Sequence, residues 1–558
     1  MIDIPIGISD FSEIRTGGYY YVDKSAFIRE LLRTKASKAT LITRPRRFGK
    51  TLNMSMLFAF FDIRQDSQGL FKGLEVSADE ALCDEWMNQW PAVFVSFKGV
   101  EGLSFEEAYS MLKAALSKLF RQHRYLMDDP KMDPFDLETY KHIAETTATS
   151  TEVKNSLETL THMLEAHYQK RVILLIDEYD VPLAKANDNG YYSEMLSVIR
   201  GMMGQSLKDN SSLELAVITG CLRIAKESIF TGVNNFISDT ISGERYNEYF
   251  GFVPEEVETL LKDTHLENFA DSIREWYDGY HFGSVDVYCP WDVMNHVNAL
   301  LINSDTPPHD YWKNTSDNAI IRSFIDRSDI DVTDKFETLL SGGYITEQIT
   351  ENLTYDMLHS SESNLWSILY LTGYLTHRPA ADLPPEVRLS DREAALQIPN
   401  EEIKNIFRET ILLWFQDKVR DMDRSRLFTA MWGNDTGTMT EEVSQLLLQT
   451  ISYYDYKEDF YHAFLAGIFT GAGYSVDSNK EYGEGRSDIV VKNIRNSRAA
   501  VFEIKHSRKL DALKDDCKTA LNRIDTRKYH KKFEGEYRSV LCYGISFYKK
   551  ECMVLGKQ

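Results

Sequence analysis

The first 245 residues alternate short apolar runs with segments of helical periodicity. Runs at 39–43, 92–97, 172–176 and 215–219 have the length and composition of strands. Continuous apolar runs of this kind suit strands that are covered on both faces, as in a parallel sheet. Residues 105–121 instead repeat their apolar side chains at helical spacing. This alternation predicts right-handed crossovers and a doubly wound α/β sheet.

The pattern changes twice after residue 245. Residues 246–450 lose the alternation and are predicted to be mostly helical, with Pro-Pro pairs at 307–308 and 384–385 marking loops or linkers. The apolar segment 365–370 predicts a helix in a small helical or winged-helix domain. Residues 451–558 predict a compact mixed α/β module. Its expected elements are a helix at 456–470, strands at 488–491, 499–504 and 539–545, and a basic helix near 510–525.

Charge divides the chain unevenly. The 558 residues carry a net charge of -22, which argues against uniform coating of DNA or of an acidic membrane. Residues 481–550, however, contain 17 Lys and Arg against 10 Asp and Glu, a local net charge of +7, so the remainder carries -29. A basic C-terminal module on an acidic body is explained either by nucleic-acid contact or by a solvated charged face.

The six cysteines are scattered and form no C-x-x-C pair, which excludes a zinc ribbon and gives no disulfide framework. The N-terminus lacks the charged and apolar regions of a signal peptide. No apolar stretch approaches the ~18 residues that a membrane span needs. We therefore expect a cytoplasmic protein with reduced thiols and no membrane partner.

A candidate phosphate-binding loop follows the first strand. Gly49, Lys50 and Thr51 open the next helix, which is the context that a P-loop requires. Backbone N–H groups and the helix N-terminus would hold the phosphates. Lys50 would reach the β- and γ-phosphates, and the Thr51 hydroxyl would bind Mg²⁺. The alternative is a chance G-K-T after a strand.

The residues before Gly49 are unusual for such a loop. Arg46, Arg47 and Phe48 precede it, and the arginines add positive potential. Arg44 stands where the P-loop consensus has glycine, and Pro45 restricts Arg44 to extended conformations. The entry to the loop is therefore expected to differ in shape, while the end that faces the phosphates is intact.

The strand at 172–176 ends in Asp177 and Glu178, the arrangement of a Walker B motif. Asp177 would hold Mg²⁺ through water, and Glu178 would orient or deprotonate the attacking water. Ligands of open α/β sheets bind beyond the strand C-termini, so both motifs should meet there and bind ATP or GTP. Thr219 ends the next strand and is a candidate γ-phosphate sensor. Arg223 would stabilise transition-state charge or, as the alternative, is a surface arginine.

The C-terminal module contains an acid–acid–lysine set. Asp488 begins one predicted strand, and Glu503 and Lys505 share a face of the next. The two carboxylates would converge on one Mg²⁺, which would activate a water, while Lys505 would orient that water or support negative charge. Glu458 on the preceding helix is a further candidate ligand. The alternative is an inactive remnant that binds nucleic acid or only stabilises the fold.

Taken together, these motifs resemble a prokaryotic family of AAA-ATPase-like proteins fused to a C-terminal PD-(D/E)XK nuclease domain. The similar segments are IPIGISDF at 4–11, YVDKS at 21–25, RPRRFGKT at 44–51, YFGF at 249–252, WYDGY at 276–280, GYLT at 373–376, EYGEGRSD at 481–488 and FEIK at 502–505. Related nucleases often have Gln on the helix after the lysine, followed by Tyr. Here Arg523 stands at that Gln position, with Tyr529 downstream.

The resemblance implies four parts. These are an AAA-like P-loop ATPase domain at 1–245, a helical lid and winged-helix-like region at 246–380, a helical connector at 381–450 and a PD-(D/E)XK nuclease-like domain at 451–558. The implied cofactors are ATP and Mg²⁺, and the implied partner of the C-terminal domain is DNA or RNA. AAA-like domains often assemble, so a homo-oligomer is one of the alternatives.

Three functions fit these observations. The first is an ATPase that regulates a Mg²⁺-dependent nuclease at Asp488, Glu503 and Lys505. The second is an ATP-dependent switch or scaffold whose nuclease-like tail binds nucleic acid or a protein without cutting. The third, a P-loop small-molecule kinase, leaves the basic tail unexplained.

Overall fold

The structure is a computed structural model of the 558-residue chain. It describes residues 2–33, 38–223, 236–312, 321, 333–357, 360–390, 392–421, 424–448, 458–470, 474–478, 481–482, 485–486, 488–528 and 530–557. By their contacts, Met1–Ser316 and Thr346–Ile403 form one compact unit, and Asp317–Ile345 and Lys404–Gln558 form a second. The division into four parts at the boundaries given above stays a prediction.

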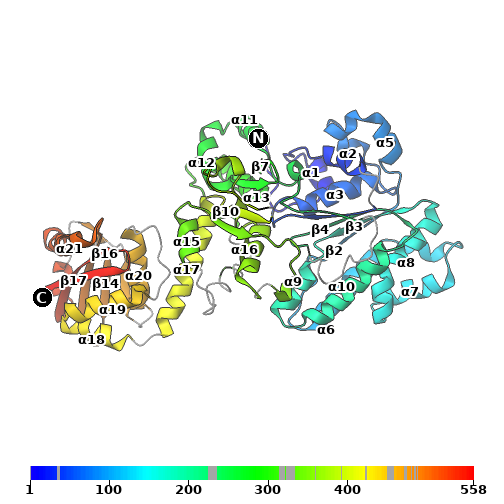
Figure 1. The fold of residues 1–558 in the computed structure, drawn as a ribbon. Helices are drawn as coiled ribbons and strands as arrows, with labels where there is room; N and C mark the ends of the chain where they lie inside the picture. Colours follow the sequence, from blue (N-terminus) through cyan, green and yellow to red (C-terminus); the bar gives the residue numbers. More distant parts are fainter. Residues whose placement is uncertain are drawn as a thin grey trace. The chain divides into compact units, whose positions relative to one another are not determined.

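A parallel five-stranded sheet forms the centre of the first unit (Figure 1). Its order is β2-β3-β4-β1-β5, and every neighbouring pair is parallel. The strands are β1 (Ala39–Thr43), β2 (Ala92–Ser96), β3 (Val172–Asp177), β4 (Leu213–Gly220) and β5 (Phe236–Asp239). Because all strands run the same way, their C-terminal ends meet at one edge of the sheet. The predicted parallel α/β sheet is therefore confirmed.

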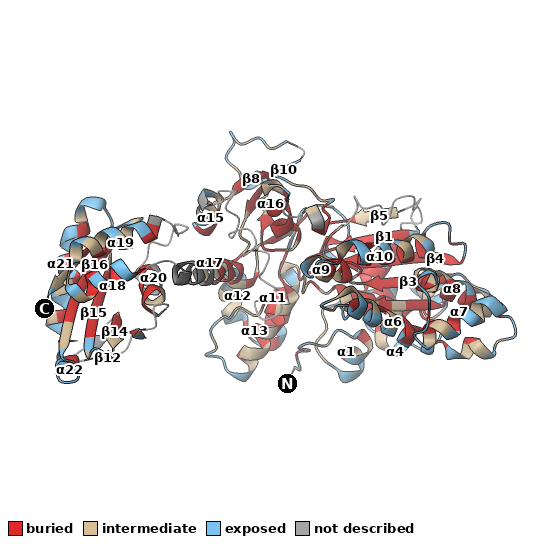
Figure 2. Cartoon of the chain, turned by 90° about the horizontal axis from the view of Figure 1, so that it is seen from below, coloured by how far each residue is buried: buried red, intermediate tan, exposed pale blue. Residues whose placement is uncertain are grey.

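Helices cover this sheet because its strands are apolar on both faces. β1 and β3 are buried along their whole length, as the red strands in Figure 2 show. Helices α1 (Phe11–Gly17) and α2 (Ala26–Arg33) precede β1, and the helices between the strands are α3 (Lys50–Phe61), α5 (Glu80–Trp86), α6 (Phe105–Arg121), α7 (Pro134–Ala144), α8 (Ser150–Tyr168), α9 (Val181–Asp188) and α10 (Tyr192–Leu207). Of these, α3 packs Met54, Leu57 and Phe60 into the core beside Ile173. The segment between β1 and α3 is consequently held from both ends.

The remainder of the first unit is mainly helical, with small sheets. Its helices are α11 (Pro254–Thr264), α12 (Ala270–Tyr277), α13 (Pro290–Ile302) and α16 (Glu362–Leu371). The hairpin β6 (Tyr280–Phe282) and β7 (Val285–Val287) lies between α12 and α13 in the chain. A three-stranded sheet has the order β8 (Ile345–Gln348), β10 (Glu393–Gln397) and β9 (Thr376–His377). The helical character expected here is confirmed, whereas the winged-helix assignment stays a prediction.

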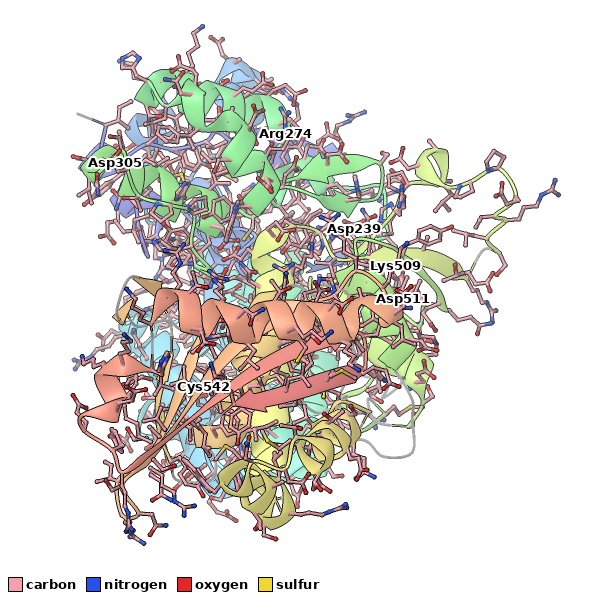
Figure 3. The ribbon with its side chains drawn as sticks, turned by 90° about the vertical axis from the view of Figure 1, so that its left-hand side faces the viewer. Asp239, Arg274, Asp305, Lys509, Asp511 and Cys542 are labelled. Atoms are coloured by element: carbon pink, nitrogen blue, oxygen red, sulfur yellow. The ribbon has the colours of Figure 1, made fainter. Side chains whose placement is uncertain are left out.

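The second unit contains a mixed sheet of the order β11-β14-β15-β16-β17. The strands are β11 (Ser475–Ser478), β14 (Ile489–Asn493), β15 (Arg498–His506), β16 (Ser539–Tyr548) and β17 (Glu551–Lys557). Only β15 and β16 pair in parallel, and α21 (Leu513–Arg527) makes the crossover between them. Figure 3 looks onto α21, which lies across this sheet, with Lys509 and Asp511 just before its first turn and Cys542 on β16.

Helices α18 (Ser425–Gly433), α19 (Thr436–Leu448) and α20 (Glu458–Thr470) complete the second unit. Their apolar side chains, including Met431, Val443 and Phe464, share a core with Phe502 and Tyr543 of the sheet. This core fixes β15 firmly in the middle of the sheet, with strands on both sides. The predicted small α/β module at the C-terminus is confirmed.

Candidate functional site

The loop after β1 has the backbone shape that phosphate binding needs. Gly49 takes φ 78° as the N-cap of α3, and Arg47 takes φ 77°. No heavy atom lies within 4 Å of the position that a Gly49 Cβ would occupy, so the backbone there is open to a ligand. Phe48 is fully buried, with its ring centroid 5.0 Å from those of both Tyr280 and Phe282. The packing of Phe48 against strand β6 of the β6–β7 hairpin therefore holds the loop in place.

The Lys50 side chain is hydrogen-bonded to the backbone at the start of the loop. Its Nζ donates hydrogen bonds to the carbonyl oxygens of Arg44 at 2.9 Å and Pro45 at 2.8 Å. The side chain is almost completely buried, because it lies beneath the loop rather than in solvent. A buried ammonium held by loop carbonyls places its positive charge at the phosphate-binding end of the sheet.

Arg44 explains why this loop lacks the usual glycine. Its side chain turns away from the loop and is fully buried. One terminal nitrogen, Nη2, donates to Asp239 Oδ2 at 2.6 Å, to Asn247 Oδ1 at 2.8 Å and to the Arg245 carbonyl at 3.0 Å. Arg44 thus ties the end of β1 to the end of β5, which is a structural role distinct from phosphate contact.

Asp177 collects three hydroxyl groups at the end of β3. Its Oδ2 accepts from Thr51 at 2.9 Å and from Ser96 at 3.1 Å, and its Oδ1 accepts from Thr219 at 2.6 Å. The carboxylate is fully buried. The sequence therefore brings together the predicted residues Thr51, Asp177 and Thr219. Ser96 was not among the predicted residues, although its place at the end of a strand run was a usable signal.

Glu178 follows in a strained conformation. Its φ is 52°, which is uncommon for a residue other than glycine and is often found at functional sites. Burial raises the pKa of Glu178 above its usual value of 4.5, the nearby Asp177 adds to this effect, and Lys50 opposes it. The side chain lines the cavity described below. A carboxyl group with a raised pKa beside a phosphate loop has the character of a general base.

Asp180 is a residue that the sequence did not indicate. Its Oδ2 accepts hydrogen bonds from the backbone N–H groups of Cys221 and Leu222, both at 2.9 Å, and from the Tyr355 hydroxyl at 3.4 Å. It therefore holds the turn after β4 in place. Arg223 follows this turn and is half-buried. Within the described part of the chain, Arg223 is not among the residues that line the cavity.

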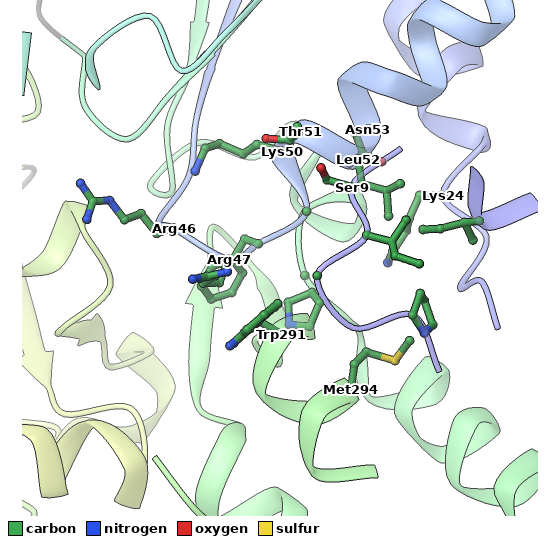
Figure 4. A pocket seen from close by; sticks show the side chains of 18 of the residues that line it. Ser9, Lys24, Arg46, Arg47, Lys50, Thr51, Leu52, Asn53, Trp291 and Met294 are labelled. Carbon is green, nitrogen blue, oxygen red and sulfur yellow. The ribbon is translucent and has the colours of Figure 1, made fainter. Parts of the chain in front are cut away.

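A cavity of about 390 Å³ opens beside the loop (Figure 4). Its polar and charged lining residues include Arg46, Arg47, Lys50, Thr51, Lys98, Glu178, Lys185 and Lys24. Its apolar lining includes the N-terminal segment 5–8 and Trp291 and Met294 of α13. A cavity lined by both cationic and apolar side chains has the chemistry to hold a ligand that carries anionic and apolar groups.

The C-terminal acids lie on neighbouring strands. β14 and β15 pair antiparallel with Ile489 opposite Phe502, which places Asp488 beside Glu503. Asp488 Oδ2 accepts a hydrogen bond from the Ile504 N–H at 2.7 Å. His462 of α20 donates from Nε2 to the Asp488 carbonyl oxygen at 2.6 Å. The strand register therefore places the two residues next to each other at one end of the β14–β15 pair, whereas their joint binding of a metal ion stays a prediction.

Two residues of α21 pair with the neighbouring charged groups. Arg523 Nε lies 2.9 Å from Glu503 Oε1, and Lys505 Nζ lies 3.4 Å from Asp516 Oδ1. The Glu458 side chain and Tyr529 fall outside the described residues. Among the residues that are described, no group of three or more His, Cys, Asp or Glu side chains is arranged to hold a metal ion.

Comparisons with known proteins match two separate segments of the chain. Residues 5–230 match a family described as predicted AAA-ATPase. Residues 456–557 match the PD-(D/E)XK nuclease superfamily. A protein of Azotobacter chroococcum mcd 1, described as "Uncharacterized protein in vnfD 5'region", is 24% identical over 571 residues, covering 99% of this chain and 98% of the relative. In the described parts of the structure, no helix combines the length and apolar character that crossing a membrane requires.

Proposed function

We propose that this chain binds and hydrolyses ATP and thereby regulates a C-terminal Mg²⁺-dependent nuclease, because residues 5–230 match a predicted AAA-ATPase family and residues 456–557 match the PD-(D/E)XK nuclease superfamily. The observation that carries the first half is the meeting of Thr51 and Asp177, whose hydrogen bond is 2.9 Å long. It joins the start of the helix after the phosphate loop to the acid at the end of β3, although 126 positions separate the two residues.

The residues around Asp177 fit a bound Mg²⁺–ATP. Hydroxyl and carboxylate oxygens are the donors that Mg²⁺ prefers, and Thr51 and Asp177 supply one of each. Mg²⁺ bound there would neutralise charge on the β- and γ-phosphates. Lys50 and the N–H groups at the start of α3 would hold the phosphates. Glu178 would take a proton from the attacking water, and Thr219 would orient the Asp177 carboxylate.

The apolar end of the cavity would hold the adenine base. Trp291 and Met294 project from α13, and Pro5 and Ile6 come from the N-terminal segment. These side chains would exclude water around the base, whereas Arg46 and Lys50 lie further from Trp291 and Met294, and Arg47 stacks on the Trp291 ring. ATP spans two such ends, with an apolar base and a chain of anionic phosphates, so one cavity accommodates the whole nucleotide.

The second half of the proposal rests on the acid pair in the second unit. Asp488 and Glu503 would bind a divalent cation through carboxylate oxygens, which suits Mg²⁺. Bound Mg²⁺ would lower the pKa of a water and stabilise negative charge on a phosphodiester. Lys505 shares a strand face with Glu503 and would support that charge. The positive local charge of residues 481–550 would attract DNA or RNA.

Regulation would use the helix that continues from one unit into the other. α17 (Glu401–Asp421) begins in the first unit, and Glu402 accepts a hydrogen bond from the Trp312 N–H at 2.8 Å. The Glu402 carboxyl group also interacts with Asp292 of α13, next to the cavity residue Trp291. A change in the cavity would therefore reach the first turn of α17 through α13.

The experiment is a cleavage assay with the full chain. Labelled single- and double-stranded DNA and RNA are incubated with Mg²⁺ or Mn²⁺, with and without ATP. The wild type is compared with Lys50→Ala and with Glu503→Gln, which keeps the shape of the side chain but removes its charge. We expect cleavage by the wild type that depends on ATP, loss of this dependence in Lys50→Ala, and no cleavage by Glu503→Gln.

Other outcomes would change the conclusion. Cleavage that is identical in Lys50→Ala and wild type at every ATP concentration would refute regulation by ATP. Wild-type ATP turnover without cleavage of any substrate would instead favour a switch whose nuclease-like domain binds a partner without cutting. The contact between Arg523 and Glu503 favours that second function, because a cation already pairs with one of the two acids.

A further inference from the structure

We propose that Arg523 is a built-in counter-ion that competes with the divalent cation for Glu503. The inference rests on the proposed metal site formed by Asp488 and Glu503. In the structure, the Arg523 guanidinium contacts the carboxylate with Nε 2.9 Å from Oε1. The positively charged group thus lies on the carboxylate to which the metal would bind. Binding of the metal then requires Arg523 to leave.

The difference in exposure between the two partners makes such an exchange feasible. The Glu503 side chain is 1% exposed, whereas that of Arg523 is 52% exposed. A cation beside a buried carboxylate offsets the cost of its burial, and both Arg523 and a metal ion would supply that positive charge. A half-exposed arginine, by contrast, is hydrated when it swings away. The exchange therefore replaces one cation by another at the acid while the arginine returns to water.

The same face of α21 also pairs with the lysine of the set. Asp516 and Arg523 are seven residues apart, about two helical turns, and so lie on one side of the helix. Asp516 contacts Lys505 at 3.4 Å, and Arg523 contacts Glu503. Helix α21 thus places the acidic Asp516 beside Lys505 and the basic Arg523 beside Glu503. Both charged groups of the Glu-x-Lys pair are neutralised by α21 at once.

Asp488 is partly engaged as well. One of its carboxylate oxygens accepts the Ile504 N–H, which orients the side chain along the strand pair. A metal ion that enters the site would keep this oriented acid and would displace only the guanidinium from Glu503. In the structure, Glu503 and Lys505 are thus paired with side chains of α21, and Asp488 accepts a backbone N–H.

The proposal is tested by Mn²⁺ binding to the full-length, nucleotide-free protein, followed by the electron paramagnetic resonance signal of free Mn²⁺. The binding component that Glu503→Gln removes defines the C-terminal site. We expect Arg523→Gln to bind Mn²⁺ at this site about tenfold more tightly than the wild type, because glutamine does not compete as a cation. Lys518→Gln is the matched control, since it removes the same charge from an exposed position of α21.

A second readout protects the test against a loss of folding. Without metal, Arg523→Gln removes the guanidinium from the buried Glu503 carboxylate, so the melting temperature of the variant should fall, and Mn²⁺ should raise it by more than in the wild type. An affinity for Mn²⁺ in Arg523→Gln equal to or weaker than that of the wild type would overturn the competition while leaving the metal site in place. If neither protein showed any component that depends on Glu503, the metal site itself would be refuted, and the competition with it.

Discussion

The guanidinium carbon of Arg47 lies 4.1 Å from the centroid of the Trp291 ring. A cation over an indole face is the favoured geometry of a cation–π pair. The contact joins the phosphate loop to the first turn of α13, and both residues line the same cavity (Figure 4). Trp291 thereby fixes an arginine at the cationic end of the cavity and forms part of its apolar wall.

Replacing Trp291 by alanine should therefore weaken ATP binding. The change removes the aromatic wall and releases Arg47 from its stacked position. Cation–π contacts contribute about 0.5–2 kcal/mol, so the dissociation constant should rise about tenfold. Trp291→Phe retains an aromatic face and should bind more tightly than Trp291→Ala. Isothermal titration of the full chain with a non-hydrolysable ATP analogue measures both, and equal affinities in the two variants would contradict a role for the ring.

Restoring the consensus glycine at position 44 should destabilise the protein. Arg44→Gly leaves Asp239 buried without its ion-pair partner, which costs about 3–5 kcal/mol in comparable sites. The midpoint of urea unfolding should fall accordingly. The double change Arg44→Gly with Asp239→Asn removes the orphaned charge and should recover part of the loss. If the double variant is no more stable than the single one, the Asp239 charge is not the cause.

ATP hydrolysis should fall as the pH is lowered, through the titration of Glu178. Burial raises the pKa of this carboxyl group, and a general base works only in its ionised form. Activity should therefore decline at a higher pH than the usual glutamate value of 4.5 implies. Glu178→Gln should bind ATP normally and lose hydrolysis by a factor of about 10²–10⁴. Phosphate release between pH 5 and 8 checks this, and a flat profile would exclude Glu178 as the base.

Asp292 and Glu402 should make the stability of the first unit depend on pH. Both are buried, and burial raises both pKa values, for Asp292 to about 6, with repulsion between the pair raising that of Glu402 further. Asp310 adds negative charge nearby, and Arg47 adds positive charge. The folded state thus keeps a proton that the unfolded chain loses above the ordinary carboxyl pKa, so stability should fall as the pH rises.

Glu402→Gln removes this titration and keeps an acceptor for the Trp312 N–H. Between pH 6 and 8, the wild type should lose up to about 1.4 kcal/mol per pH unit relative to this variant. Urea unfolding at pH 6, 7 and 8 measures the difference. Parallel curves for the two proteins would show that the pair does not hold a proton in the folded state.

Local sequence patterns were sufficient to predict where the Gly49-Lys50-Thr51 segment and the Asp177-Glu178 pair lie in the sheet. Each of these segments follows an apolar run that is long enough to form a strand. Gly49-Lys50-Thr51 therefore comes after the C-terminal end of β1, and Asp177-Glu178 lies at the C-terminal end of β3. Parallel pairing then brings such ends together whatever the strand order. The parallel sheet and the C-terminal α/β module were predictable for the same reason.

The contacts that complete the sites could not be predicted in this way. Arg44 meets Asp239 and Arg47 meets Trp291 across 195 and 244 positions of the chain, respectively, and no local pattern encodes such pairs. In the sequence, Asp180 is one of many polar residues at the start of a helix. Its contact with the backbone N–H of Cys221 depends on the tertiary fold. Arg523 stood out in the sequence, but only the fold of α21 against β15 shows that it contacts Glu503.

The cavity is assembled from segments of the first unit that lie far apart in the chain. Pro5 and Met294 line it together, so its walls leave the ribosome about 290 residues apart. At synthesis rates of about 5–20 residues per second, the second wall emerges roughly 15–60 s after the first. A nascent chain interrupted before α13 would carry the whole phosphate loop but no closed pocket. Nucleotide capture would thus report that most of the first unit has already been translated and folded.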